Sequence, residues 1–308
     1  MLQYIGKRIL ALIPTLFIVS LVSYYFIHLI PGDPARLVAG PDANITEVDS
    51  IREQLGLNDP IWMQYLNYMK NLLAGDLGTS VKSGQPVTEM FENRFRNSIL
   101  LTFTSIIWAF FAGILIGTLS AVFKNKLPDY IGMVLAVSGI SIPGFWLGLL
   151  LIQWLSVSLG WLPTGGADGW RSYIMPSIAL GAGIMAMIAR FTRSSLLNSL
   201  GSDYVRTGRA KGLGNAAVIV KHALRNSMIP VVTITGLQFG YLLGGSVVVE
   251  TVFSFPGMGR LLIDSIAFRD YQVIQALLLL FAAEFILVNL IVDVLYSFLN
   301  PKIRTGTA

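Results

Sequence analysis

Residues 98–123 read SILLTFTSIIWAFFAGILIGTLSAVF, a run of 26 positions without a charged side chain. As an α-helix with a rise of about 1.5 Å per residue, this run is longer than the roughly 30 Å hydrocarbon core of a bilayer is thick. Helices in the core of a soluble protein are seldom so long and so uniformly apolar. The run therefore predicts a membrane-spanning helix within an all-α membrane protein.

Five further apolar stretches resemble the first in length and composition. The six predicted spans occupy residues 9–30, 98–123, 131–157, 174–189, 228–248 and 273–299. The fourth is the shortest, and the aromatic residues Trp170 and Tyr173 are expected to anchor it at one membrane surface. Arg190 and Arg193 are expected to reach the other surface. The first span is expected to be retained, because no small-residue cleavage site follows it.

The composition agrees with this class of protein. Of the 308 residues, 54% are hydrophobic and 13% are charged, whereas soluble domains carry about 25% charged residues. The sequence contains no cysteine, which excludes disulfides, zinc–thiolate centres and thiol catalysis. Because only two histidines are present, His28 and His222, we expect no metal site.

The distribution of positive charge predicts the orientation in the membrane. Short cytoplasmic loops carry the excess of Lys and Arg. Residues 190–227 hold seven basic side chains and one acidic side chain, Asp203, so this segment is placed in the cytoplasm. Both chain termini then lie in the cytoplasm, and the large loop at residues 31–97 lies outside. The whole chain, residues 1–308, is predicted to form a single transmembrane domain.

The external loop at residues 31–97 is expected to contain short helices. Residues 44–55 show a capping pattern at Thr46. Residues 60–73 place apolar side chains three and four positions apart, and residues 86–96 repeat this pattern and run into the second span. Two interpretations stay open: the loop folds back onto the membrane surface, or it offers a docking face to an external partner.

The cytoplasmic segment at residues 190–227 has an unusual composition. Between positions 203 and 212, cations alternate with small residues that would let the backbone of a partner approach closely. The charges either serve only to hold the orientation or mark a short helix that touches another protein. The candidate contact residues are Asp203, Tyr204, Arg206, Gly208, Arg209, Ala210, Lys211 and Gly212.

Small and polar residues inside the spans predict helix packing. Glycines spaced four apart let helices approach closely, and Pro14 and Pro143 predict kinks. The candidate packing residues are Gly113, Gly117, Gly236, Gly240 and Gly244. Polar side chains at membrane depth are expected mainly to bridge helices by hydrogen bonds. These polar residues are Gln153, Gln238, Glu284, Asn289 and Asp293.

Several catalytic motifs are absent from the sequence. It contains no Gly-x4-Gly-Lys-Ser/Thr phosphate loop, no His-Glu-x-x-His and no Gly-x-Ser-x-Gly. We therefore expect no enzyme activity, and any ATP used for transport would be hydrolysed by another protein. A self-contained carrier would favour an internal repeat. The first half of the chain holds no second copy of the basic cytoplasmic segment.

The ordered set of spans, external loop and basic segment resembles the permease subunits of ATP-binding-cassette (ABC) importers of the dipeptide, oligopeptide and nickel group. The motifs are Ile30-Pro-Gly-Asp-Pro34, Gly75-Asp-Leu-Gly78, residues 204–213, His222-Ala-Leu-Arg-Asn226, Phe255-Pro-Gly-Met-Gly259, Arg269-Asp-Tyr271 and Asn300-Pro-Lys-Ile-Arg304. In the cytoplasmic motif, Gly212 takes the place of the family's glycine, and Gly208 stands where the peptide group usually has alanine. Arg206 replaces the acidic first position of the superfamily pattern.

The resemblance implies a type I ABC importer permease fold in a bacterial inner membrane. It implies a second homologous permease, two nucleotide-binding ATPase subunits that hold ATP and Mg, and an external solute-binding protein. It implies no cofactor on this chain and no nucleic acid partner. Residues 205–212 would be the coupling helix that docks on an ATPase subunit. The candidates for the translocation path are Gln153, Gln238 and Glu250.

Three short segments indicate the substrate. Residues 137–141, 160–168 and 189–193 look closest to the glutathione-importing branch of the group. The expected cargo is therefore glutathione or a short peptide. Nickel or a nickel chelate remains an alternative, and a self-contained carrier or a membrane scaffold is a more distant one.

Overall fold

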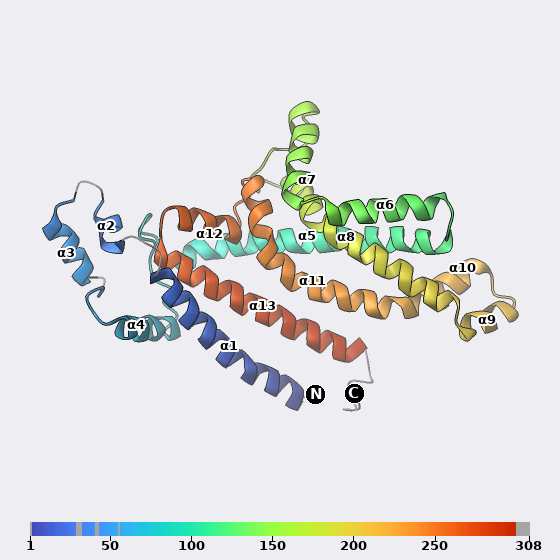
Figure 1. Cartoon of the computed structure of the whole chain (residues 1–308), viewed down its shortest axis with the longest axis horizontal. Helices are drawn as coiled ribbons and strands as arrows, with labels where there is room; N and C mark the ends of the chain where they lie inside the picture. The colour runs from blue at the N-terminus through green and yellow to red at the C-terminus, as the bar shows by residue number, and fades with distance from the viewer. Residues whose placement is uncertain (1, 29–32, 41–42, 55, 300–308) are drawn as a thin grey trace. The chain divides into compact units, whose positions relative to one another are not determined.

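The computed structural model describes residues 2–28, 33–40, 43–54 and 56–299. Helices account for almost all regular structure in these ranges, where a single isolated bridge joins Thr79 and Pro86. Figure 1 shows the helices along the chain. They are α1 (Leu2–His28), α2 (Pro34–Ala39), α3 (Ile45–Gln54), α4 (Ile61–Leu73), α5 (Val87–Val122), α6 (Leu127–Ser141), α7 (Gly144–Leu151), η1 (Ile152–Ser158), α8 (Arg171–Leu200), α9 (Asp203–Ala210), α10 (Asn215–Ala217), η2 (Val218–Leu224), α11 (Arg225–Val252), α12 (Met258–Ala267) and α13 (Tyr271–Leu299).

The chain forms two compact units. The first consists of Leu2–Ser98 and Pro256–Ile286, and the second contains Ile99–Phe255 together with the last turns of α13. The helices predicted in the external loop are present in the first unit, as α3, α4 and the start of α5. The cap expected at Thr46 is wrong by two positions. Asn44 caps α3, because its side chain accepts from the Glu47 N–H (2.8 Å) and the Glu47 carboxylate accepts from the Asn44 N–H (3.0 Å).

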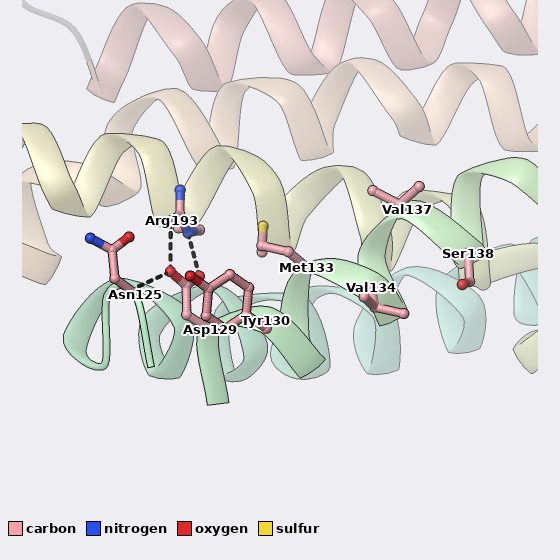
Figure 2. Close-up of a pocket in the computed structure, with 8 residues that line it drawn as sticks. All are labelled: Asn125, Asp129, Tyr130, Met133, Val134, Val137, Ser138 and Arg193. Atoms are coloured by element: carbon pink, nitrogen blue, oxygen red, sulfur yellow. Dashed lines mark hydrogen bonds and ion pairs between the residues drawn. The ribbon is translucent and has the colours of Figure 1, made fainter. Parts of the chain in front are cut away.

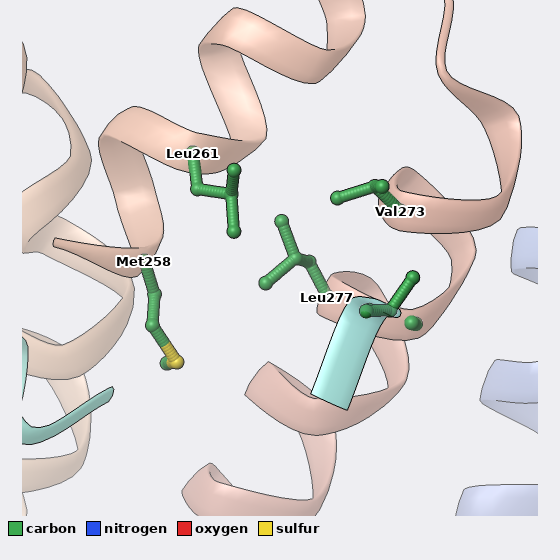
Figure 3. Close-up of a cluster of buried hydrophobic side chains, with 6 residues drawn as sticks. Met258, Leu261, Val273 and Leu277 are labelled. Carbon is green, nitrogen blue, oxygen red and sulfur yellow. The ribbon is translucent and has the colours of Figure 1, made fainter. Parts of the chain in front are cut away.

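The core of the first unit joins the start of α5 to α12 and α13. Figure 3 shows Leu261 of α12 and Val273 and Leu277 of α13 pointing toward one another. Val87, at the first position of α5, is fully buried in the same cluster. This apolar contact holds together segments that lie more than 150 positions apart in the sequence.

A buried carboxylate fastens the loop before α5 to the start of α13. Asp270 accepts a hydrogen bond from the Ser80 hydroxyl (2.6 Å) and weaker ones from the N–H groups of Val81 (3.3 Å) and Lys82 (3.4 Å). Gln272 accepts from the N–H of the neighbouring Thr79 (2.9 Å). Residues 79–82 are therefore bound as a block to the turn that begins α13.

Helix α8 organises the second unit and is longer than the predicted span at residues 174–189. Its 30 residues run from Arg171 to Leu200, so it begins slightly before the predicted start and continues well past the predicted end. Gly113 and Gly117 of α5 lie against it: a Cβ on Gly113 would come within 2.7 Å of Ile188, and one on Gly117 would overlap the Ala189 carbonyl. The two helices can approach this closely only because both α5 positions are glycine.

The predicted span at residues 131–157 is not one straight helix. Its two halves, α6 and α7 with η1, meet at an angle of 105°. Pro143 has no N–H to continue the helix, and the residue before it, Ile142, adopts an extended ψ of 120°. Helix α11 also bends, by 58° between Leu242 and Ser246. The stretch between these residues contains Gly244, and glycine weakens a helix at such a position.

The spans are therefore only partly reproduced as single helices. Among the described residues, α5, α8 and the Tyr271–Val292 part of α13 are long and apolar enough to cross a membrane. Two more candidate spans are added if each of the two bent segments, α6 with α7 and η1, and the segment that contains α11, counts as a single crossing. Helix α1 contributes a shorter apolar segment, Leu12–Tyr25. A multi-pass helical membrane protein follows from this arrangement.

Candidate functional site

The basic segment at residues 190–227, which we predicted to lie in the cytoplasm, is mostly helical. Helix α8 continues to Leu200, and after a short turn α9 begins beyond Ser202, whose ψ of 156° is typical of a residue that precedes a helix. The segment then passes through α10 and η2 into α11. Gly212 ends the turn after α9 with a left-handed φ of +78°, a conformation that glycine adopts without strain.

One face of α9 is buried within the chain. Val205 is completely buried and belongs to a cluster with Leu196 of α8 and with Val218 and Ala223 of η2. Gly208 lies on the same face and is buried as well. The helix therefore packs against α8 and against the segment that leads into α11.

The other face of α9 carries the charges and points to solvent. Asp203 and Arg206 are almost fully exposed, and their side chains lie 3.7 Å apart. Such an exposed pair contributes little stability. Arg209, Ala210 and Lys211 are exposed too, so this face offers cations and small residues to a partner.

Tyr204 links the start of α9 to its neighbours. Its hydroxyl is hydrogen-bonded to Ser199, Ser202 and Asn226, which lie before α9 and at the start of α11. Partial burial acts to raise the pKa of Tyr204, but these hydrogen bonds lower it below its ordinary value. The sequence pattern gave Tyr204 as a contact residue without indicating this internal role.

The two glycines of the motif, Gly208 and Gly212, differ in whether another residue could replace them. A Cβ on Gly208 would meet Leu213 at 3.7 Å and Val218 at 3.8 Å, which are ordinary contact distances. Alanine therefore fits at position 208. Around Gly212 nothing lies within 4 Å of such an atom, but its positive φ disfavours any other residue.

A second feature of the same unit was missed by sequence reasoning. Figure 2 shows Arg193 of α8 and Asp129 of α6 forming a bidentate ion pair, in which Nε donates to Oδ1 (2.7 Å) and Nη2 to Oδ2 (2.8 Å). The N–H of Asn125 donates to the same carboxylate (2.9 Å). Arg193 thus binds another helix, whereas we expected it only to reach the membrane surface. The sequence did contain a signal for this ion pair, because an acidic residue lies near the start of one predicted span and an arginine lies near the end of another.

The groove beside this pair is apolar along most of its length. Tyr130, Met133, Val134 and Val137 line it together with Ser138, as Figure 2 shows. The ion pair closes one end of the groove. Asp129 is 4% exposed and Arg193 is 26% exposed, so the carboxylate is the more deeply placed partner.

The three candidates for the translocation path have different surroundings. Gln153 is exposed on η1. The Gln238 amide nitrogen lies 2.9 Å from the Met187 sulfur. Glu250 is completely buried and accepts from the Ser246 hydroxyl (2.9 Å).

The remaining residues singled out from the sequence are placed as follows. Gly236 packs against Val292 of α13, where a Cβ would lie within 2.8 Å of the valine. Gly240 is buried, whereas Gly244 is open, with nothing within 4 Å. Glu284 is buried, and the side chain of Asp293 lies outside the described residues. In the part of the chain that the structure describes, no group of three or more His, Cys, Asp or Glu side chains could hold a metal.

Comparison with protein families gives two matches that together cover most of the chain. The model of the family described as "Binding-protein-dependent transport system inner membrane component" matches residues 113–305. The model of the N-terminal component of the same transport systems matches residues 1–102.

Curated relatives match over nearly the full length. The chain is 56% identical, over 99% of both sequences, to the glutathione transport system permease protein GsiC of Escherichia coli strain K12. It is 57% identical, with the same coverage, to the protein of that name from Salmonella typhi.

Two solved structures share the fold. The MetNI methionine ABC transporter in inward-facing conformations matches 69% of this chain and 97% of its own, with a TM-score of 0.59 and 18% identity. An amino acid ABC transporter crystallised with histidines matches 68% of this chain and 94% of its own, with a TM-score of 0.56 and 15% identity. At this level of identity the likeness is one of fold.

Proposed function

Because the chain belongs to the family of inner-membrane components of binding-protein-dependent transport systems, we propose that it is the permease of an importer for glutathione or short peptides. A member of this family is a multi-pass inner-membrane subunit of an ABC importer. Such a subunit carries the solute across the membrane, and separate subunits of the complex hydrolyse ATP. The observation that carries the choice of cargo is the 56% identity to a glutathione permease over 99% of both chains.

The exposed face of α9 is the proposed docking site for an ATPase subunit. It presents Arg206, Arg209 and Lys211 to solvent, and its other face is anchored by Val205 to α8 and η2. When the ATPase subunits close on ATP, α9 moves with the subunit that it touches. Because α8 and α11 are continuous with the segments on which α9 packs, the movement passes into the membrane-spanning helices.

The remaining parts of the proposal concern topology and assembly. Residues 1–308 form one transmembrane domain with six crossings and both termini in the cytoplasm, in which each bent helix pair is one crossing and α1 is another. Two homologous permeases and two ATPase subunits, which hold ATP and Mg, assemble with an external solute-binding protein. That protein contacts the external regions at residues 31–97 and 250–272. Gln153, Gln238 and Glu250 are proposed to lie along the translocation path.

Uptake in cells tests the cargo. A strain that lacks its own glutathione permease is supplied with this chain and its partner subunits, and the uptake of radiolabelled glutathione is measured. We expect the cells to accumulate radiolabelled glutathione in a process that requires ATP, and an excess of unlabelled glutathione should reduce this accumulation. If a dipeptide competes better, the cargo is a short peptide. If only nickel accumulates, or if no solute does although the complex assembles, the proposed cargo is wrong.

A further inference from the structure

Helix α4 lies beside the first membrane span. The hydroxyl oxygens of Tyr65 in α4 and Ser20 in α1 are 2.9 Å apart, inside a buried contact. The rings of Tyr65 and Tyr68 pack on Tyr24, with centroids 5.3 and 5.4 Å away. Both helices belong to the first unit, in which they lie next to each other (Figure 1).

The contact lies below the external end of α1. Ser20 precedes His28, the last described residue of α1, by eight positions. At a rise of about 1.5 Å per residue, this separation is about 12 Å along the helix axis. An amphipathic helix in the membrane interface buries its apolar face about 5–10 Å into the boundary between headgroups and acyl chains. The predicted first span ends at residue 30, so Ser20 lies about 15 Å below its external end, within the outer half of a core about 30 Å thick. Helix α4 is therefore held beside the outer half of that span.

A second face of α4 is apolar and uncovered within the chain. Trp62 and Leu66 are each 54% exposed and Leu73 is 83% exposed. At about 100° per residue, these three side chains fall within one narrow sector of the helix, next to the sector that holds Tyr65. Apolar area of this kind marks a surface that contacts lipid or another protein.

The third face of α4 is polar and completes the pattern of an interfacial helix. Asn67 and Asn71 are exposed on the side away from the apolar sector, and Gln64 donates to the Asp59 carbonyl (2.8 Å). The single charge of the helix, Lys70, lies where its long stem can carry the ammonium group out to water. A helix with this arrangement has one side suited to acyl chains and the opposite side suited to headgroups and water.

We propose that α4 is embedded in the outer leaflet of the membrane, with Trp62, Leu66 and Leu73 against lipid acyl chains. The apolar sector is continuous with the exposed apolar surface of α1, because Phe17, which is 52% exposed, contacts the Tyr65 ring with centroids 6.4 Å apart. The proposal rests on the proposed topology, in which α1 crosses the membrane and residues 31–97 lie outside.

Single cysteines test the proposal directly, since the chain contains none of its own. Leu66→Cys and Leu73→Cys are labelled with a small fluorophore, and Asn67→Cys on the polar face is the matched control. The importer is assembled with partner subunits that carry no cysteine and is placed in liposomes. A quencher attached to the upper acyl chain of the lipid should reduce the fluorescence at positions 66 and 73 several-fold more than at position 67. Iodide in the water should show the reverse order.

Two results would overturn the lipid contact. If iodide quenches positions 66 and 73 as well as it quenches position 67, the apolar face lies in water. If neither quencher reaches positions 66 and 73, a protein partner covers that face. Labelling of Asn67→Cys in intact cells by a charged, impermeant maleimide tests the leaflet separately. If that thiol is labelled only after the membrane is opened, the orientation is wrong while the lipid contact of α4 stands.

Discussion

Replacing Arg193 by methionine should destabilise the protein more than replacing its partner Asp129 by asparagine. In Arg193→Met, a carboxylate that is 4% exposed loses the guanidinium that pairs with it, and its remaining hydrogen-bond donor is the Asn125 N–H. In Asp129→Asn, the guanidinium, which is 26% exposed, can turn toward water, and asparagine still accepts from Asn125. The ion pair should therefore respond asymmetrically to removal of one partner or the other.

The magnitude follows from the burial of the two groups. Breaking a buried ion pair from one side costs about 3–5 kcal/mol. Because Asp129 keeps one backbone donor and Arg193 is partly hydrated, we expect about 2 kcal/mol for Arg193→Met, or roughly 30-fold in the folding equilibrium. For Asp129→Asn we expect less than about 1 kcal/mol. The double variant should recover most of the loss, since no unpaired charge remains.

The free energy of unfolding is measured by SDS titration of the purified protein in mixed micelles. The wild type, both single variants and the double variant form a double-mutant cycle. Equal losses in the two single variants would contradict the reasoning from exposure. A double variant no more stable than Arg193→Met would show that the buried carboxylate is not the source of the loss.

Three further predictions concern glycines and the external loop. Gly212→Glu should abolish uptake, because only glycine adopts a φ of +78° without strain. The control variant Gly214→Glu, at a φ of −63°, should retain most of the uptake. Equal uptake by the two variants would refute the role of the left-handed turn. Gly117→Val should lower thermal stability in detergent, because its side chain would overlap the Ala189 carbonyl, and an unchanged melting temperature would contradict the α5–α8 contact. Asp270→Asn should speed protease cleavage at residues 79–82, measured on spheroplasts, because it weakens the contact with Ser80. An unchanged rate would show that Asp270 does not hold the loop.

Local sequence patterns predicted the local features of this fold. All but the last residue of the apolar run at residues 98–123 lies within α5, and the helix predicted at residues 60–73 is α4, which begins at Ile61. The basic motif likewise forms a short helix, α9, but this helix begins two residues before the predicted range of 205–212 and ends at Ala210, since Gly212 adopts a left-handed turn. These features depend on side-chain periodicity and on glycine within a few positions, which a single sequence records.

The features that sequence reasoning missed depend on distant residues. Asp129 and Arg193 are separated by 64 positions, and Ser80 and Asp270 by 190. Each pair forms only after helices have packed, and neither partner has a distinctive neighbourhood in the sequence. Pro143 did predict a kink, but the 105° angle between α6 and α7 depends on the helices packed around them.

The hydrogen bonds around Asp270 have a mechanical consequence. Residues 79–82 are tied to the first turn of α13, and α13 continues without a break to Leu299. In the proposed topology, a force applied to residues 79–82 at the external face would therefore not be absorbed by a flexible loop. The force would be transmitted along α13, a continuous helix whose last residue, Leu299, lies more than 20 residues farther along the chain.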